Sequence, residues 1–210
     1  TKTHSSETIP SISISYDYNS DRSLKSKTKE TSFGTSINHY TYDGNTILIG
    51  SESEVYTKIH LSPSNQITHT ETFGGPETGF YTFKEYYYDE SGQINRVLFK
   101  KRDGSTEQEF NIKVDKNPNP FKIFDSKIPN GLSLRMIEDA QSYSGYGDLP
   151  DDFSMDDDNW GYFNDTNMIS CTYNNQIEYD YNFTYDENRR PISIDYAFRP
   201  STTLIITYYD

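Results

Sequence analysis

The 210-residue sequence predicts a single all-β domain, an antiparallel meander whose strongly curved or barrel-like sheet carries one long irregular insertion. Composition gives the first reason. Aromatic residues make up 15% of the chain, with 19 Tyr and 12 Phe, and there are 19 Ile against 8 Leu and two Ala. Isoleucine and aromatic residues favour strands, whereas alanine and leucine favour helices. This composition argues against a helical bundle and disfavours a βαβ enzyme.

Alternation of apolar and polar residues gives the second reason, because a period of two is the pattern of a half-buried strand. Segments with this pattern lie at 12–18, 47–49, 55–61, 81–87, 110–114, 177–185, 192–196 and 204–208. Their spacing predicts a meander of roughly ten to fourteen strands.

A recurring turn between these segments gives the third reason. Tyr-Asp, a short polar turn and an Ile follow one another at 42–47, 88–94 and 185–192, and Ser replaces Asp in a version at 61–67. The Asp side chain can accept a hydrogen bond from the backbone two residues on. Gly92, Asn65 and Asn188 are the residues expected to adopt the positive φ that tight hairpins often require. Each unit therefore predicts a hairpin, and consecutive hairpins build a meander.

The pattern also divides the chain into segments. Residues 1–11 are polar and predict a flexible N-terminal tether, and residues 12–210 predict the single β domain. Alternation fails over 117–167, which we interpret as an irregular insertion that covers an end or edge of the sheet. Long loops inside compact domains are usually functional or disordered, so the insertion is the segment that looks specialised.

Charge and cysteine content exclude several classes of function. The net charge is -13, and the longest basic stretch is Lys100-Lys101-Arg102, so nucleic acid is not an expected partner. No run approaches 18 apolar residues, which predicts no transmembrane segment. The single cysteine, Cys171, lies in an apolar run and is expected to fill a gap in the core rather than act as a nucleophile.

Three stretches in a fixed order resemble a known family. They are Tyr-Asp-Glu-Ser-Gly at 88–92, Val-Asp-Lys-Asn-Pro-Asn-Pro-Phe-Lys at 114–122, and the segment 183–192 after an irregular stretch. This order resembles the uncharacterised envelope lipoproteins of Bacteroidetes, whose domain of unknown function is described as porin-like or open-barrel in shape. The resemblance covers roughly residues 12–210. It implies export, a lipid anchor on a cysteine upstream of Thr1 as the only membrane contact, and a location at the outer membrane or cell surface. It carries over no catalytic residue.

The insertion holds the candidate binding residues. Aromatic planes beside carboxylates and amides suit the apolar faces and polar edges of sugar rings. The candidates are Trp160, Tyr162, Tyr143 and Tyr146, and the alternative is that such rings pack the insertion onto the sheet. Asp156, Asp157 and Asp158 belong to an acidic cluster that could supply oxygen ligands to calcium, although a solvated loop is the favoured interpretation. No cofactor is expected.

Histidines give no catalytic pattern. His60 and His69 flank the turn at 61–67 and could lie opposite each other, for which two surface histidines are the favoured interpretation over a metal site. The chain lacks a nucleophile elbow, a phosphate-binding loop and a dinucleotide fingerprint, so we expect no enzyme.

The resemblance and the aromatic insertion together imply a non-catalytic, exported cell-envelope protein, a surface lipoprotein that binds a glycan or another extracellular ligand. The alternative is a structural or protein–protein component of an envelope assembly, with an envelope protein as partner.

Overall fold

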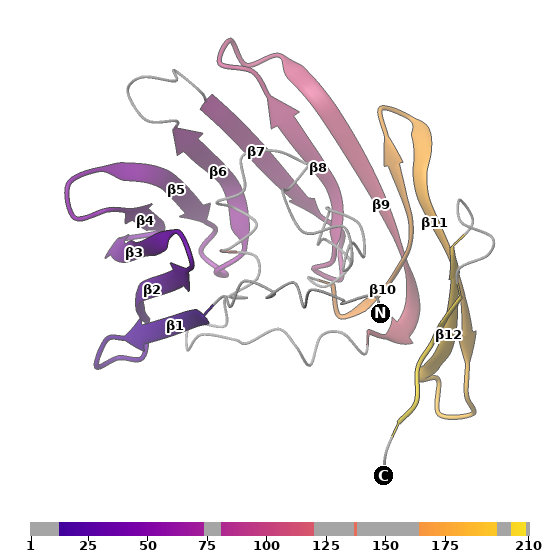
Figure 1. Ribbon diagram of the computed structural model, residues 1–210. Helices are drawn as coiled ribbons and strands as arrows, with labels where there is room; N and C mark the ends of the chain where they lie inside the picture. Colours follow the sequence, from indigo (N-terminus) through magenta and orange to yellow (C-terminus); the bar gives the residue numbers. More distant parts are fainter. Residues whose placement is uncertain (1–12, 74–80, 120–136, 138–163, 197–202, 209–210) are drawn as a thin grey trace, which may run out of the picture.

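The computed structural model describes residues 13–73, 81–119, 137, 164–196 and 203–208. Thirteen strands follow one another in a single antiparallel sheet whose spatial order is the chain order (Figure 1). They are β1 (Ser13–Tyr18), β2 (Leu24–Thr31), β3 (Gly34–Asp43), β4 (Thr46–Gly50), β5 (Val55–Leu61), β6 (Ile67–Phe73), β7 (Tyr81–Tyr88), β8 (Ile94–Lys100), β9 (Thr106–Pro118), β10 (Thr166–Tyr173), β11 (Gln176–Tyr185), β12 (Pro191–Tyr196) and β13 (Thr203–Ile205). The predicted fold class is confirmed.

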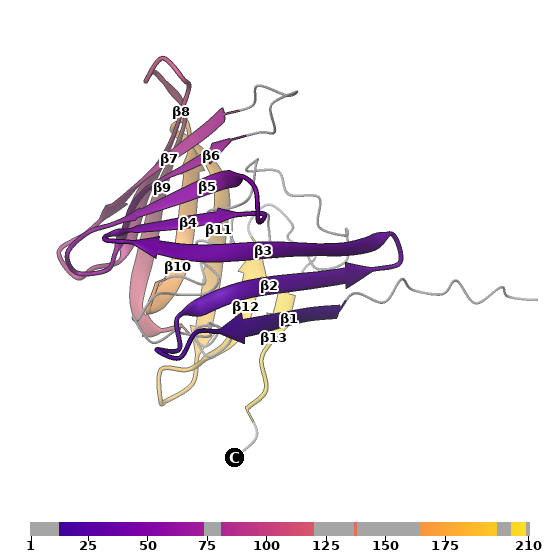
Figure 2. The same ribbon diagram turned by 90° about the vertical axis from the view of Figure 1, so that its left-hand side faces the viewer.

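The sheet is strongly curved and open. Figure 1 shows the strands along an arc that begins at β1, and Figure 2 shows the same arc with β1 to β3 facing the viewer. Among the described strands, β1 pairs only with β2 and β13 pairs only with β12. No helix in the described part of the chain is long and apolar enough to cross a membrane.

One face of the sheet carries the core. A row of directly paired residues crosses it from Ile47 through Ile59 and Thr70 to Lys84 and Phe99. All five side chains are buried, and the Lys84 ammonium lies 5.1 Å from the centroid of the Phe99 ring. A cation over a ring face regains part of the solvation that burial removes. The curved sheet therefore accommodates a charged side chain on its core face.

Two other core residues bear on the sequence predictions. Cys171 on β10 is fully buried in the core cluster, as expected for a gap-filling cysteine. Ile137 lies in the chain between β9 and β10 and is also fully buried in this cluster. The segment between these strands therefore contributes at least one side chain to the core.

Five hairpin turns share one backbone geometry. They span 19–23, 62–66, 89–93, 101–105 and 186–190. In each, the N–H of the first residue donates to the carbonyl of the fifth at 2.8–2.9 Å, and the N–H of the fourth donates to the carbonyl of the first at 2.9–3.0 Å. The fourth residue has a positive φ of 62–84°, at Arg22, Asn65, Gly92, Gly104 and Arg189. The hairpins expected at 61–67, 88–94 and 185–192 are present.

Aspartate side chains stabilise several of these turns by accepting hydrogen bonds from backbone N–H groups, as the sequence predicts. Oδ1 of Asp89 accepts hydrogen bonds from the N–H groups of Ser91 at 2.9 Å and Gln93 at 3.0 Å. Asp186 makes the equivalent pair of bonds in its own turn. The expectation for Asn188 was wrong: the positive φ falls on Arg189, because the left-handed residue is the fourth of the turn and not the third.

Candidate functional site

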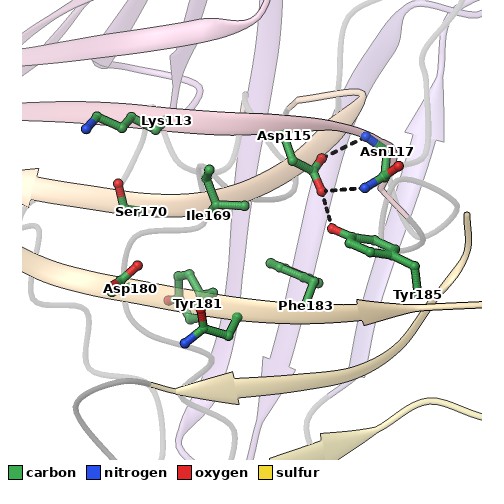
Figure 3. Close-up of a pocket in the computed structure, with 10 residues that line it drawn as sticks. Lys113, Asp115, Asn117, Ile169, Ser170, Asp180, Tyr181, Phe183 and Tyr185 are labelled. Carbon is green, nitrogen blue, oxygen red and sulfur yellow. Dashed lines mark hydrogen bonds between the residues drawn. The ribbon is translucent and has the colours of Figure 1, made fainter.

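A groove of about 480 Å³ lies along three adjacent strands, and Figure 3 shows the side chains that line it. We call it the β9–β11 groove. Its lining residues are Lys113, Asp115 and Asn117 of β9, Ile169 and Ser170 of β10, and Asp180, Tyr181, Asn182, Phe183 and Tyr185 of β11. Aromatic rings and polar groups therefore meet in one concave surface.

Three aromatic rings of β11 form the apolar side of the groove. Tyr181, Phe183 and Tyr185 occupy alternate positions of the strand, so their side chains share one of its faces. The Phe183 and Tyr185 rings stack with centroids 6.0 Å apart and an interplanar angle of 15°. The Tyr181 and Phe183 centroids lie 6.5 Å apart with the rings tilted by 56°. All three side chains are half-buried, so they keep ring surface available to a ligand.

Asp115 forms the polar end of the groove. The hydroxyl of Tyr185 donates a hydrogen bond to Oδ2 of this carboxylate (Figure 3). The backbone N–H of Asn117 donates to Oδ1 at 2.9 Å, and its side-chain amide donates to Oδ2 at 3.2 Å. Burial and the hydrogen bond to Asp115 raise the pKa of Tyr185 to about 12, so its phenol remains a donor at neutral pH.

Asn167 of β10 also belongs to this hydrogen-bond network. Only 2% of the residue is exposed, and its N–H donates to Oδ1 of Asp115 at 3.1 Å. Its side-chain amide lies 3.2 Å from the carbonyl of Asn117 and 3.3 Å from that of Pro118. Asn167 therefore ties β10 to the end of β9 and fixes the Asp115 carboxylate.

Arg189, in the turn between β11 and β12, contacts the β9 residues at the same end. Its Nε donates to Oδ1 of Asn117 at 2.8 Å, and its Nη2 donates to the carbonyl of Lys116. The turn residue with the strained φ thus reaches across to β9. This contact links the turn after β11 to the end of β9, across β10.

A second cluster lies on β5 and β6. His60 pairs directly with His69 across the hairpin, which confirms that the two residues lie opposite each other. Their rings stack at 4.1 Å, and Nε2 of His60 lies 3.0 Å from Oε1 of Glu71. Burial and the neighbouring His60 lower the pKa of His69, which favours its neutral form. These three side chains are the group that could hold a metal ion among the described residues.

The site residues predicted from sequence lie outside the described residues. This applies to Trp160, Tyr162, Tyr143 and Tyr146 and to Asp156, Asp157 and Asp158. The sequence patterns do not predict the groove, although Asp115 and Tyr185 belong to the motifs that carry the resemblance. The aromatic alternation over 177–185 was a usable signal, because one of its faces becomes the apolar side of the groove.

No protein-family model matches the sequence, and no curated protein matches it. A porin-like protein from Bacteroides uniformis ATCC 8492 is 14% identical, with a TM-score of 0.42 over 87% of this chain and 81% of that protein. The strand pairing described above, rather than this similarity, establishes the antiparallel fold.

Proposed function

We propose that this chain is a non-catalytic, exported cell-envelope protein that binds a glycan in the β9–β11 groove. The observation that carries the proposal is the aromatic side formed by Tyr181, Phe183 and Tyr185, with carboxylate and amide groups beside it. Sugar rings present apolar C–H faces and hydroxyl edges, so a ring ladder flanked by hydrogen-bonding groups complements both.

The size and charge of the groove fit this ligand class. A volume of about 480 Å³ lies within the usual range for small-ligand sites. Lys113 is the single basic residue of the lining, while Asp115 and Asp180 are acidic. A neutral or cationic ligand therefore suits the groove better than a polyanion, which is consistent with the net charge of -13.

The bonding of Asp115 supports a role in binding rather than catalysis. Its two oxygens accept hydrogen bonds from Tyr185, Asn117 and Asn167. A general acid or nucleophile needs an oxygen that can approach the reacting atom, and these bonds occupy that capacity. In our proposal Asp115 fixes the shape of the groove and orients the Tyr185 ring.

The resemblance to exported envelope lipoproteins supports the proposed location at the outer membrane or cell surface. It rests on the motifs at 88–92, 114–122 and 183–192. The structure assigns a physical role to two of them, because Asp115 and Tyr185 meet at the groove.

A glycan-array screen of the purified chain, run with calcium and with chelator, tests the proposal. We expect the parent chain and the Tyr87→Ala variant to bind the same glycans, and the Phe183→Ala variant to lose this binding. Tyr87 is a matched control because it is an exposed aromatic residue on β7, away from the groove. Hits that survive Phe183→Ala would exclude the groove as the site, and a blank array would contradict glycan binding.

One observation favours the alternative, a protein–protein role in an envelope assembly. β1 lies at the edge of the described sheet, and its Ile14 and Tyr18 are 46% and 48% exposed. An open edge with apolar side chains can pair with a strand of another protein. This role predicts that an envelope protein co-purifies with the chain and that Ile14→Lys abolishes its capture.

A further inference from the structure

We propose that His60, His69 and Glu71 form a binding site for a divalent transition-metal ion of the Zn²⁺ class. This site lies on β5 and β6 and is independent of the proposed glycan groove. A ligand nitrogen of each histidine and a carboxylate oxygen of Glu71 lie within 4.8 Å of one another.

The register of one hairpin brings the ligands together. The turn at 62–66 and the register shift between His60 and Leu61 place His60 directly opposite His69. Glu71 follows two positions later on β6, so its side chain points to the same face. The alternate residues on these strands, Ile59 and Thr70, are buried in the core, whereas the side chains of His60 and Glu71 are 27% and 25% exposed. Solvent can therefore deliver an ion to this face.

Hydrogen bonds fix which nitrogen of His69 can act as a ligand. The hydroxyl of Thr68 donates its one hydrogen to the carbonyl of His60 at 3.1 Å. The same hydroxyl oxygen lies 3.1 Å from Nδ1 of His69, and it can only accept there. Nδ1 of His69 therefore carries the hydrogen, and Nε2 of the neutral ring holds the lone pair. A hydrogen-bond partner on the other ring nitrogen is the usual arrangement of a metal-bound histidine.

A hydrogen bond joins His60 to Glu71 at the position where a metal ion would bind. A carboxylate only accepts hydrogen bonds, so Nε2 of His60 donates to Oε1 of Glu71 across the 3.0 Å separation. A cation at Nε2 requires the neutral tautomer with its hydrogen on Nδ1, so this hydrogen moves from Nε2 to Nδ1 and the neutral ring releases no net proton. Nδ1 of His60 lies 3.4 Å from the hydroxyl oxygen of Thr46, which can accept this hydrogen.

The donor set selects the ion. Two imidazoles and one carboxylate suit Zn²⁺, Cu²⁺ or Ni²⁺, whereas Ca²⁺ and Mg²⁺ take oxygen ligands. Three protein ligands leave a fourth tetrahedral position for water or an external ligand. Ligand atoms of a tetrahedral zinc site are about 3.3 Å apart, so binding must tilt the stacked rings toward one another. His69 also stacks on the Phe83 ring with centroids 5.3 Å apart, so this movement falls to the partly exposed His60 and Glu71 side chains.

The charged side chains next to the site, those of Glu85 and Lys58, contact other residues. Glu85 lies directly opposite His69 on β7, but its carboxylate accepts hydrogen bonds from Lys100 and Tyr87. Lys58, opposite Glu71, places its ammonium 5.3 Å from the centroid of the Phe73 ring. The sequence alone favoured two surface histidines here; the structure adds Glu71 as the third ligand.

Calorimetric titration of the full, chelator-treated chain with Zn²⁺ tests the proposal, with thermal unfolding as a second readout. We expect saturable binding, a higher melting temperature with Zn²⁺, and a loss of affinity of about tenfold or more in His69→Ala and Glu71→Gln. His39→Ala and Glu30→Gln are the matched controls, because they remove a histidine on β3 and an exposed acid on β2, away from the site. Both controls should bind as the parent chain does.

The variants also separate this site from other zinc-binding residues of the chain. Circular dichroism of each zinc-free variant checks that it folds, and His60→Gln provides a second, more conservative replacement. Absence of saturable Zn²⁺ binding would overturn the proposal. Equal affinity in the parent chain and in the folded His60→Gln and His69→Ala variants would overturn it as well.

Discussion

The hydroxyl of Tyr185 on β11 donates a hydrogen bond to the carboxylate of Asp115 on β9, across the intervening strand β10 (Figure 3). The two residues are 70 positions apart in the sequence. This bond fixes the distance between the polar and aromatic sides of the groove. The bond also gives the hydroxyl of Tyr185 a structural role at the end of the row of aromatic rings on β11.

Tyr185→Phe should destabilise the protein by about 1–2 kcal/mol, because Asp115 loses one donor while the ring stays in place. Chemical denaturation measures this free energy of unfolding. Tyr87→Phe serves as the control, since Tyr87 is itself exposed and its hydroxyl donates to Glu85, away from the groove. Equal stability of Tyr185→Phe and the parent chain would contradict the role of this bond in holding the groove.

Alkaline pH should remove the contribution of Tyr185. The pKa of its phenol is raised from 10.0 in the unfolded chain to about 12 in the folded protein, so folding favours the protonated form. The contribution is complete below pH 10 and declines as the pH rises toward 12. Thermal unfolding over this range should show the stability difference between the parent chain and Tyr185→Phe shrinking. A difference that stays constant to pH 12 would contradict this titration.

Acid should weaken the hairpin turn at 89–93. Burial opposes ionisation of Asp89, but hydrogen bonds from Ser91 and Gln93 outweigh it and lower the pKa of the carboxyl below 3.8. A lowered pKa in the folded state gives stability that is present above the unfolded pKa and is lost as the pH falls through the folded pKa. Asp89→Asn keeps an oxygen acceptor without the titration. We therefore expect its unfolding free energy to fall less than that of the parent chain below about pH 4.

Two arginines with left-handed backbones should respond differently to glycine. Arg22 and Arg189 have φ values of 66° and 64°. Glycine removes the steric cost of this conformation, so Arg22→Gly, in an exposed turn, should stabilise the protein by up to about 1 kcal/mol. Arg189→Gly should gain less or destabilise, because it also loses the hydrogen bonds to Asn117 and Lys116. Parallel thermal melts of the two variants decide this, and equal gains would show that the Arg189 contact contributes nothing.

Alternation and turn chemistry were enough to predict the fold class. The segments 55–61 and 81–87 coincide with β5 and β7, because one face of each strand is buried and the other is half-exposed. β2 was missed: its sequence Leu-Lys-Ser-Lys-Thr-Lys-Glu-Thr has one apolar residue, although Leu24 and Ser26 are both buried. Its pairing with β1 and β3, rather than its own pattern, makes it a strand.

The candidate sites depended on register, which the sequence did not specify. His60 and His69 flank one short turn, so their proximity was predictable from local spacing. Asp115, Asn167 and Tyr185 come from three strands, and bulges in the pairing of β9 with β10 decide which side chains meet. A shift by one residue moves each side chain to the other face of the sheet, so the groove could not be predicted without the paired strands.

The most direct test of glycan binding in the β9–β11 groove uses the glycan that gives the strongest signal on the array. This glycan is titrated into three folded variants. Phe183→Ala alters the groove, Trp160→Ala alters the aromatic site predicted from sequence, and Tyr87→Ala is the control. We expect calorimetry to show binding lost in Phe183→Ala and retained in Trp160→Ala and Tyr87→Ala. Full binding by Phe183→Ala, together with loss in Trp160→Ala, would contradict the groove and place the ligand at the insertion.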